Sequence, residues 1–273
     1  MSTAATKGTA LVTGASSGIG AVYADRLAQR GYDLILVARN KERLASLARR
    51  LTRDTGRSVE TVAADLTDPA DLRRVEQILR TNTDISLLVN NAGVGASAPL
   101  LASDVDKMEE MISLNVTALT RLTYAAVPEF VARRNGTIIN IASIVAITHE
   151  SLNGVYSGSK AFVLALTNSL VNELADKGIR VQAVLPGATA TEFWDIAGKP
   201  VHQLPPQWVM SADDMVDAAL VGLDLGEIVT IPALANSAEW ERYEAARRAM
   251  AGKLSSTIPA PRYNVRQPER RSA

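Results

Sequence analysis

The chain has 273 residues, of which 47% are hydrophobic, and its 29 basic and 29 acidic side chains give a formal net charge of zero. This balance argues against a nucleic-acid-binding protein, because neutralising phosphates requires a basic excess. The chain has no cysteine and only two histidines, which excludes disulfides, thiolate catalysis, cysteine-ligated metals and a three-histidine zinc site. Oxygen-ligand metals stay open on this count, but we assign no metal ligand.

No stretch of the sequence looks like a targeting or membrane segment. The apolar run before the first glycines is too short for a secretory signal, and no run approaches the ~18–20 apolar residues that span a bilayer. We therefore expect a cytoplasmic protein without a membrane partner.

Short β-branched runs alternate with longer helical patterns along the chain. Strands are predicted at residues 9–13, 34–38, 58–63, 85–89, 136–142, 180–185 and 228–231, and helices at 19–30, 40–52, from 67–69 onward, 105–131 and 156–177. Near-continuous apolar strands between helices indicate a parallel sheet covered on both faces. The predicted fold is α/β, a single doubly wound Rossmann-like domain with a seven-stranded parallel sheet.

Two segments depart from this alternation. Residues 189–210 carry three aromatic residues and three prolines, and we expect an irregular, partly apolar loop that covers a substrate. Residues 251–273 are polar and basic, which is typical of a frayed terminal tail. We accordingly expect a nucleotide-binding catalytic domain over residues 1–250, with its substrate loop at about 189–210, and a tail over 251–273.

A glycine-rich turn, TGASSGIG at residues 13–20, joins the first strand to the first helix. Glycines at such a place let the backbone turn tightly and let a pyrophosphate approach the N–H groups of the helix. The spacing G-x-x-x-G-x-G differs from the more common G-x-G-x-x-G. A plain turn would explain these glycines as well, so the motif alone does not establish a dinucleotide site.

The same residues also match G-x-S-x-G, the nucleophile elbow of α/β-hydrolases, with Ser16 as the nucleophile. That chemistry needs an acid and then a histidine later in the chain, and only His149 and His202 are available. An elbow on the first strand is also early for that fold. The sequence therefore favours a dinucleotide-binding enzyme over a hydrolase.

The end of the second strand indicates which dinucleotide is bound. NAD-binding folds place an acid there to hold the ribose 2′-hydroxyl, but this strand ends at Arg39, and Asp33 lies at its opposite end. A guanidinium suits a 2′-phosphate. The sequence thus favours NADP(H) and leaves NAD(H) possible, unless Arg39 is an ordinary solvated arginine.

Tyr156 and Lys160 are four residues apart at the start of a helix and share one face. A phenol is a poor acid–base catalyst at neutral pH, but a neighbouring cation favours its ionised form and lowers its pKa. Ser143 follows the fifth strand, at the edge where open α/β sheets bind ligands, and its hydroxyl could bond a carbonyl oxygen. A tyrosine–lysine pair at this spacing also arises by chance.

Taken together, the motifs resemble the short-chain dehydrogenase/reductase family, classical type, across about residues 7–230. The matching segments are TGASSGIG at 13–20, Asp65-Leu66, NNAG at 90–93, Asn115, Ser143, YSGSK at 156–160 and PGATAT at 186–191.

The resemblance implies a catalytic tetrad of Asn115, Ser143, Tyr156 and Lys160. In this family the tyrosine exchanges a proton with the substrate oxygen and the serine orients that oxygen. The lysine binds the nicotinamide ribose and lowers the pKa of the tyrosine, while the asparagine kinks its helix and holds a water of a proton relay. The cofactor supplies the hydride.

The resemblance also implies the cofactor contacts. Asp65 and Leu66 would contact the adenine, and Thr189 and Thr191 the carboxamide, although Thr189 replaces the aliphatic residue common at its position. The full implied set is Gly14, Ser16, Ser17, Gly18, Ile19, Gly20, Arg39, Asp65, Leu66, Asn91, Ala92, Gly93, Tyr156, Lys160, Pro186, Gly187, Thr189 and Thr191.

The expected substrate is a neutral, mostly apolar ketone or secondary alcohol, acted on by a carbonyl reductase. The apolar residues expected to enclose it are Ile144, Val145, Ile147, Phe193, Trp194 and Trp208. Family members commonly form homodimers or homotetramers through the two long central helices. The alternative is a non-catalytic NADP-binding regulator or scaffold, against which the intact tetrad argues.

Overall fold

The computed structural model describes residues 6–265. It divides the chain into two compact units, with the division between Ala233 and Leu234. The limits expected from the sequence, 1–250 for the catalytic domain and 251–273 for a tail, remain predictions, because a compact unit is not by itself a functional domain. Residues 266–273 of the expected tail lie outside the described residues.

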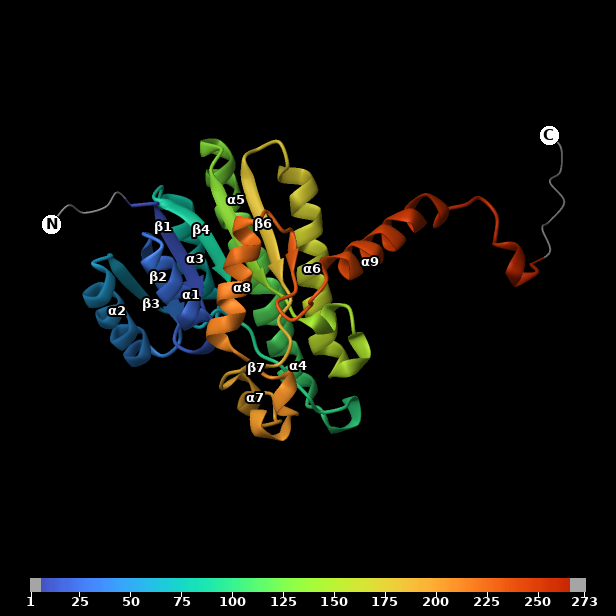
Figure 1. Ribbon diagram of the computed structural model, residues 1–273, viewed down its shortest axis with the longest axis horizontal. Coiled ribbons are helices and arrows are strands. Elements are labelled where there is room, and N and C mark those ends of the chain that lie inside the picture. Colours follow the sequence, from blue (N-terminus) through green and yellow to red (C-terminus); the bar gives the residue numbers. More distant parts are fainter. Residues whose placement is uncertain (1–5, 266–273) are drawn as a thin grey trace. The chain divides into compact units, whose positions relative to one another are not determined.

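Within residues 6–265, seven parallel strands form one sheet in the order β3-β2-β1-β4-β5-β6-β9, and this confirms the predicted fold class (Figure 1). The chain builds outward from β1 to β3 and then continues from β4 on the other side of β1. The strands are β1 Thr9–Thr13, β2 Asp33–Ala38, β3 Val59–Ala63, β4 Ile85–Asn90, β5 Gly136–Ile141, β6 Ile179–Val184 and β9 Val229–Thr230. Ligands of open α/β sheets bind where the strand order reverses, beyond the carboxyl ends of β1 and β4.

Helices cover both faces of the sheet. One face packs against α1 Gly18–Gln29, α2 Lys41–Thr55 and α8 Ala212–Asp224, and the other against α3 Pro69–Thr81, α5 Leu119–Arg133 and α6 Gly154–Leu174. Because successive side chains of a strand point to opposite faces, Leu34 and Leu36 of β2 belong to the first core and Ile35 and Val37 to the second. Burial on both faces explains the continuous apolar runs of the sequence.

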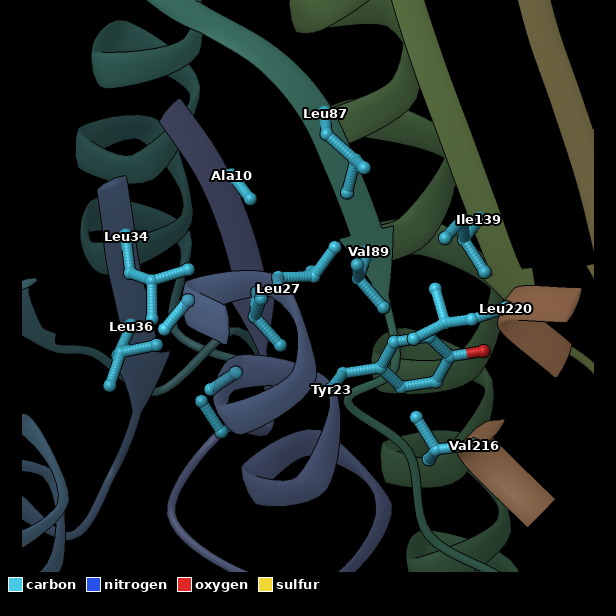
Figure 2. Packing of buried hydrophobic residues seen from close by; sticks show 14 of the residues in the cluster. Ala10, Tyr23, Leu27, Leu34, Leu36, Leu87, Val89, Ile139, Val216 and Leu220 are labelled. Atoms are coloured by element: carbon cyan, nitrogen blue, oxygen red, sulfur yellow. The ribbon is translucent and has the colours of Figure 1, made fainter. Parts of the chain in front are cut away.

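The first core is centred on α1. Figure 2 shows Leu27 of this helix lying between Leu36 of β2 and Val89 of β4, with the Tyr23 ring next to Val89 and to Leu220 of α8. All five side chains are buried, and their burial fixes the start of α1, and with it the glycine turn, against the carboxyl end of β1.

The long helix predicted over residues 105–131 is interrupted. It consists of α4 Val105–Ile112, a π-helical turn Ser113–Ala118 and α5. Such turns insert one extra residue into a helix and commonly occur at functional sites. This interruption lies at Asn115, where the family resemblance implies a kink.

The segment 189–210 is more ordered than the irregular loop that the sequence suggested. It begins with β7 Thr189–Ala190, continues through α7 Phe193–Ile196, and ends at β8 Met210–Ser211, which pairs with β7 in parallel. The indole of Trp194 donates a buried hydrogen bond of 3.0 Å to the carbonyl of Thr189. The pairing of β7 with β8 closes the segment at its base, below the carboxyl ends of the strands in Figure 1.

The second unit contains α9 Ser237–Met250 and short 3-10 turns at Ala251–Lys253 and Pro261–Tyr263. Asn236 caps α9 by accepting a hydrogen bond from the backbone of Ala238, and Glu244 pairs with Arg247 and Arg248 on the same helix. Across both units, the part of the chain that the structure describes has no helix long and apolar enough to cross a membrane.

Candidate active site

A cavity of about 840 Å³ opens at the carboxyl ends of β1, β4, β5 and β6. This volume falls in the range of small-molecule and cofactor sites. Its wall contains most of the site residues expected from the sequence, which are Gly14, Ser17, Gly18, Ile19, Asn91, Ala92, Gly93, Ser143, Tyr156, Lys160, Pro186, Gly187, Thr189 and Thr191. The expected residues that are not on this wall are Ser16, Gly20, Arg39, Asp65, Leu66 and Asn115.

The glycine turn requires its glycines for conformation and for space. Gly14 and Gly18 have φ angles of 66° and 53°, in the left-handed region that side chains rarely adopt. A Cβ atom on Gly20 would lie 2.4 Å from the carbonyl oxygen of Gly14 and 2.5 Å from Nδ2 of Asn91. Ser17, the N-cap of α1, makes no side-chain capping bond, and it lines the cavity with Gly18 and Ile19, so the uncapped start of the helix suits a phosphate.

The segment after β4 is tied to this turn by Thr13. The Thr13 hydroxyl accepts hydrogen bonds of 3.0 Å from the backbone N–H groups of Asn91 and Ala92 and donates one to the carbonyl of Val89. Asn91 in turn donates from Nδ2 to the carbonyl of Thr13 at 2.9 Å. Two walls of the cavity are therefore held together by Thr13, a residue that sequence reasoning did not single out.

Tyr156 and Ser143 lie together at the centre of the cavity wall. Tyr156 is on the first turns of α6 and 5% exposed, and Ser143 lies two residues after the end of the buried strand β5. Burial raises the pKa of the Tyr156 phenol to about 12, and a hydrogen bond with Ser143 opposes this effect. The phenol therefore keeps its proton at neutral pH and is suited to donate it.

Lys160 is buried beside Tyr156. Its Nζ donates a hydrogen bond of 2.9 Å to the carbonyl of Ile141 and lies 5.9 Å from the centroid of the Tyr156 ring. Burial lowers the pKa of Lys160 to about 8. The sequence suggested that the lysine would lower the pKa of the tyrosine; in this structure desolvation raises that pKa, and the role of the lysine stays a prediction.

Asn115 does not line the cavity itself but binds the backbone of Val94, which does. Its Nδ2 donates to the Val94 carbonyl at 2.9 Å and to the Ser159 hydroxyl at 3.1 Å, and its Oδ1 accepts from the Val94 N–H at 3.0 Å. A Cβ atom on Gly93 would be 3.0 Å from Oδ1 of Asn115 and 3.5 Å from Nζ of Lys160. The π-helical turn thus directs the asparagine at the same backbone that Lys160 approaches.

The expected adenosine contacts lie beyond this wall, at the ends of β2 and β3. The Arg39 side chain is 74% exposed, and its Nη1 is 3.8 Å from a carboxylate oxygen of Asp65. Asp65 accepts hydrogen bonds from the backbone and hydroxyl of Thr67. Leu66 packs in the core, so it can offer a ligand only its backbone.

The other end of the cavity is mostly apolar. Ile144, Val145, Phe193, Trp194 and Trp208 line it as expected, whereas Ile147 does not. The wall also contains residues that sequence reasoning did not single out: Glu192, Lys199, Leu204, Gln207, Val209 and Met210 belong to the segment 189–210 that was expected to cover the substrate, and Ser151 and Leu152 lie outside the expected segments. None of these residues belongs to a motif; those of the segment 189–210 lie within the part of the chain that the pairing of β7 with β8 closes, whereas Ser151 and Leu152 lie just before α6.

The structure does not support a hydrolase site at Ser16. This serine is not on the cavity wall, and the His149 ring contacts the carbonyl of Val145 at 3.2 Å. Throughout residues 6–265, neither His149 nor His202 is hydrogen-bonded to Ser16. Within the same residues, no group of three or more acidic or histidine side chains is placed to hold a metal ion.

Comparisons with known proteins agree with this geometry. The short chain dehydrogenase family model matches residues 8–199. A short-chain dehydrogenase from Sphingobium yanoikuyae, solved in complex with NADPH, is 49% identical with a TM-score of 0.91, covering 94% of this chain and 99% of that one. The bulky-bulky ketone specific alcohol dehydrogenase from Comamonas testosteroni is 42% identical with a TM-score of 0.87, covering 95% and 99% of the two chains.

A curated relative of known reaction is more distant. The very-long-chain 3-oxoacyl-CoA reductase-A of Danio rerio is 33% identical over 208 residues, which are 75% of this chain and 65% of the relative. The family model alone covers well over half of the present chain. The chain therefore belongs to the short-chain dehydrogenase/reductase family, whose members are oxidoreductases that act on CH–OH and C=O groups with NAD(P).

Proposed function

We propose that this protein is an NADP(H)-dependent carbonyl reductase that interconverts a bulky, neutral, mostly apolar ketone and its secondary alcohol, with Tyr156 as the acid and base. The observation that carries the proposal is that Tyr156, Ser143 and Lys160 line one large cavity, with Nζ of Lys160 5.9 Å from the centroid of the Tyr156 ring. The glycine turn lines the same cavity, so one space accepts both a dinucleotide and a substrate.

The residues present fit NADP(H). The N–H groups of α1 and the glycine turn would hold the pyrophosphate, and Arg39 the 2′-phosphate, because an exposed guanidinium beside a helix start binds phosphate well. When bound, the nicotinamide supplies or accepts the hydride. We assign the remaining contacts to the expected residues on the wall. Thr189 is a poor side-chain ligand, since its hydroxyl donates to the carbonyl of Gly187 at 3.2 Å.

The proton steps fall to this chain's own side chains. In ketone reduction the Tyr156 phenol donates its proton to the substrate oxygen, and the Ser143 hydroxyl holds that oxygen in place. The Lys160 ammonium stabilises the phenolate that is left, since an adjacent cation favours the ionised form. Asn115 holds the wall at Gly93 and would position the water that returns the proton.

The substrate class follows from the apolar end of the cavity. Its aromatic and aliphatic side chains favour a ligand with large apolar groups. The description of the Comamonas testosteroni relative as specific for bulky ketones supports two large substituents on the carbonyl carbon. Lys199 also lines the cavity, but the wall around Tyr156 offers no cation besides Lys160, so the reacting end of the substrate is neutral.

We further propose a homodimer or homotetramer in the cytoplasm. The two long helices α5 and α6 carry exposed aromatic side chains, Tyr124 and Phe162, which a second copy could cover. Neither nucleic acid nor membrane is a partner in this proposal, which rests on the charge balance and on the absence of a long apolar run in the sequence.

The test is a panel of aryl and alkyl ketones, assayed by the absorbance of the reduced nicotinamide. Tyr156→Phe should abolish turnover and leave NADPH binding nearly unchanged, because it removes only the transferred proton and its oxygen. Unchanged turnover in this variant would refute the mechanism. If the wild-type chain binds NADPH but turns over no ketone or alcohol, the alternative of a non-catalytic NADP-binding regulator or scaffold is favoured.

A further inference from the structure

Arg43 is a second arginine after the carboxyl end of β2, four residues beyond Arg39, to which we assign the 2′-phosphate. It lies on the first turn of α2, and its backbone N–H donates a hydrogen bond of 2.9 Å to Oδ1 of Asn40, which caps that helix. Arg39 directly precedes the cap. Both arginines therefore follow the carboxyl end of β2, where the start of α2 adds a positive potential.

Glu192 comes from the segment that encloses the cavity on its other side. It lines the cavity and follows Thr191, whose methyl group lies 3.1 Å from the position of a Cβ on Gly18. The next residue, Phe193, packs against Tyr156 with ring centroids 5.8 Å apart. Glu192 thus belongs to a segment that touches both the glycine turn and the proposed catalytic tyrosine.

An ion pair connects these two elements. Nη1 of Arg43 donates to Oε2 of Glu192 at 2.6 Å, although 149 residues separate the two in the chain. In the described part of the chain, this carboxylate is the only partner of the Arg43 guanidinium. The pair raises the pKa of Arg43 and lowers that of Glu192 through their mutual hydrogen bond.

The pair is suited to exchange its partners. The two side chains are 50% and 58% exposed, and water weakens ion pairs of this kind. A phosphate group carries more charge than a carboxylate and can accept two parallel hydrogen bonds from one guanidinium. A phosphate within reach of Arg43 would therefore displace the carboxylate.

We propose that Glu192 is a specificity-determining residue for the cofactor, acting by competition with the 2′-phosphate for Arg43. The inference rests on the proposed use of NADP(H). It means that the Glu192 carboxylate lowers the affinity of the protein for NADP(H). NADP(H) must displace Glu192, whereas NAD(H) has no 2′-phosphate and leaves the ion pair in place. Displacement of Glu192 also removes one contact of the segment that carries Phe193. Binding of the 2′-phosphate therefore alters a segment that packs against Tyr156.

The competing explanation is that Arg39 alone holds the phosphate. The Arg43–Glu192 pair would then stay closed as a bridge over the cofactor groove and would serve NADP(H) and NAD(H) equally. The two explanations differ in what happens to the ratio of the two affinities when the Glu192 charge is removed.

The experiment measures dissociation constants of the full-length chain for NADPH and NADH by calorimetric titration. Glu192→Gln should tighten NADPH binding about threefold to fivefold, which is the strength of an exposed ion pair, and change NADH binding by less than about twofold. Arg43→Met should weaken NADPH binding on the order of tenfold, as expected for a lost charge-assisted contact, with little effect on NADH.

Two controls isolate the competition. In the Arg43→Met background, Glu192→Gln should no longer change NADPH binding, because the competitor has lost its target. Asp195→Asn removes the same charge from an exposed position on α7, three residues away, and should leave the NADPH-to-NADH ratio unchanged. It separates local exchange from a general effect of net charge.

The inference is overturned if Glu192→Gln weakens both cofactors alike, which would indicate a bridge. It is also overturned if Glu192→Gln does not change NADPH binding, or if it changes NADPH binding equally in the wild type and in the Arg43→Met background. A failure of the proposed function is distinct, because in that case the wild-type chain binds NADPH no more tightly than NADH, or binds neither cofactor.

Discussion

Lys160→Met should stabilise the folded protein at neutral pH, although it removes a proposed catalytic residue. The lysine is 7% exposed, and its ammonium donates one hydrogen bond, to the carbonyl of Ile141. Burial lowers its pKa from 10.5 to about 8. A shift of this size means that the structure disfavours the charged form by roughly 3 kcal/mol relative to water.

Methionine has a similar length and no charge, so it fits the same space without that cost. The variant loses the hydrogen bond to Ile141, which is worth about 1 to 2 kcal/mol. The expected net effect is therefore an increase of about 1 to 2 kcal/mol in the free energy of unfolding near pH 7, together with the loss of activity.

The pH dependence gives a second, independent signature. Since the pKa of Lys160 is lower in the folded than in the unfolded chain, the unfolded chain binds more protons between about pH 8 and 10.5. The stability contributed by this group is thus present above pH 10.5 and lost as the pH falls through 8. The advantage of Lys160→Met should shrink as the pH rises from 7 to 10.

The assay is urea unfolding of both proteins at pH 7 and 9.5 without added cofactor, followed by circular dichroism. A variant that is less stable than the wild type by more than about 1 kcal/mol at pH 7 would refute the reasoning. So would a difference that does not change with pH, because the burial of the ammonium would then be fully compensated.

Further predictions concern the cofactor and the proton. Gly20→Ala should weaken NADPH binding at least about tenfold, because its Cβ would overlap the Gly14 carbonyl. Gly158→Ala, with open space at its Cβ, is the matched control. Equal losses of NADPH affinity in the two variants would contradict the role of the glycine turn. Arg39→Ala should weaken NADPH but not NADH about tenfold in titrations, and a wild-type preference for NADH would exclude our interpretation of Arg39. Alcohol oxidation needs the phenolate of Tyr156, whose pKa is raised to about 12, so kcat/KM for oxidation should rise from pH 7 to 10; a decline over this range would contradict the assignment.

The sheet could be predicted from the sequence because its central strands are buried on both faces. A run such as residues 34–38 must be apolar at every position, since alternate side chains enter opposite cores. The helix starts were also readable. Asp68 accepts hydrogen bonds from the backbone of Ala70 and Asp71, with Pro69 at the first helical position, as local capping rules predict.

The order within residues 189–210 was not predictable in this way. Its two strands have two residues each, too few to produce a periodic pattern, and they pair across the whole segment. The same is true of the π-helical turn at Asn115, which is stabilised by hydrogen bonds to Val94, 21 residues away in the chain. Contacts between distant segments leave no local signature.

The sequence by itself determined the fold class, the glycine turn and the placement of Tyr156 and Lys160 on one face of a helix. These features depend on local spacing and on the alternation of apolar residues, which a single chain displays directly. Only the tertiary structure decided the proton affinities, since burial raises the pKa of Tyr156 and lowers that of Lys160. It also decided which charges meet across the cavity: Arg43 and Glu192 form their ion pair because folding brings α2 against the segment after β7.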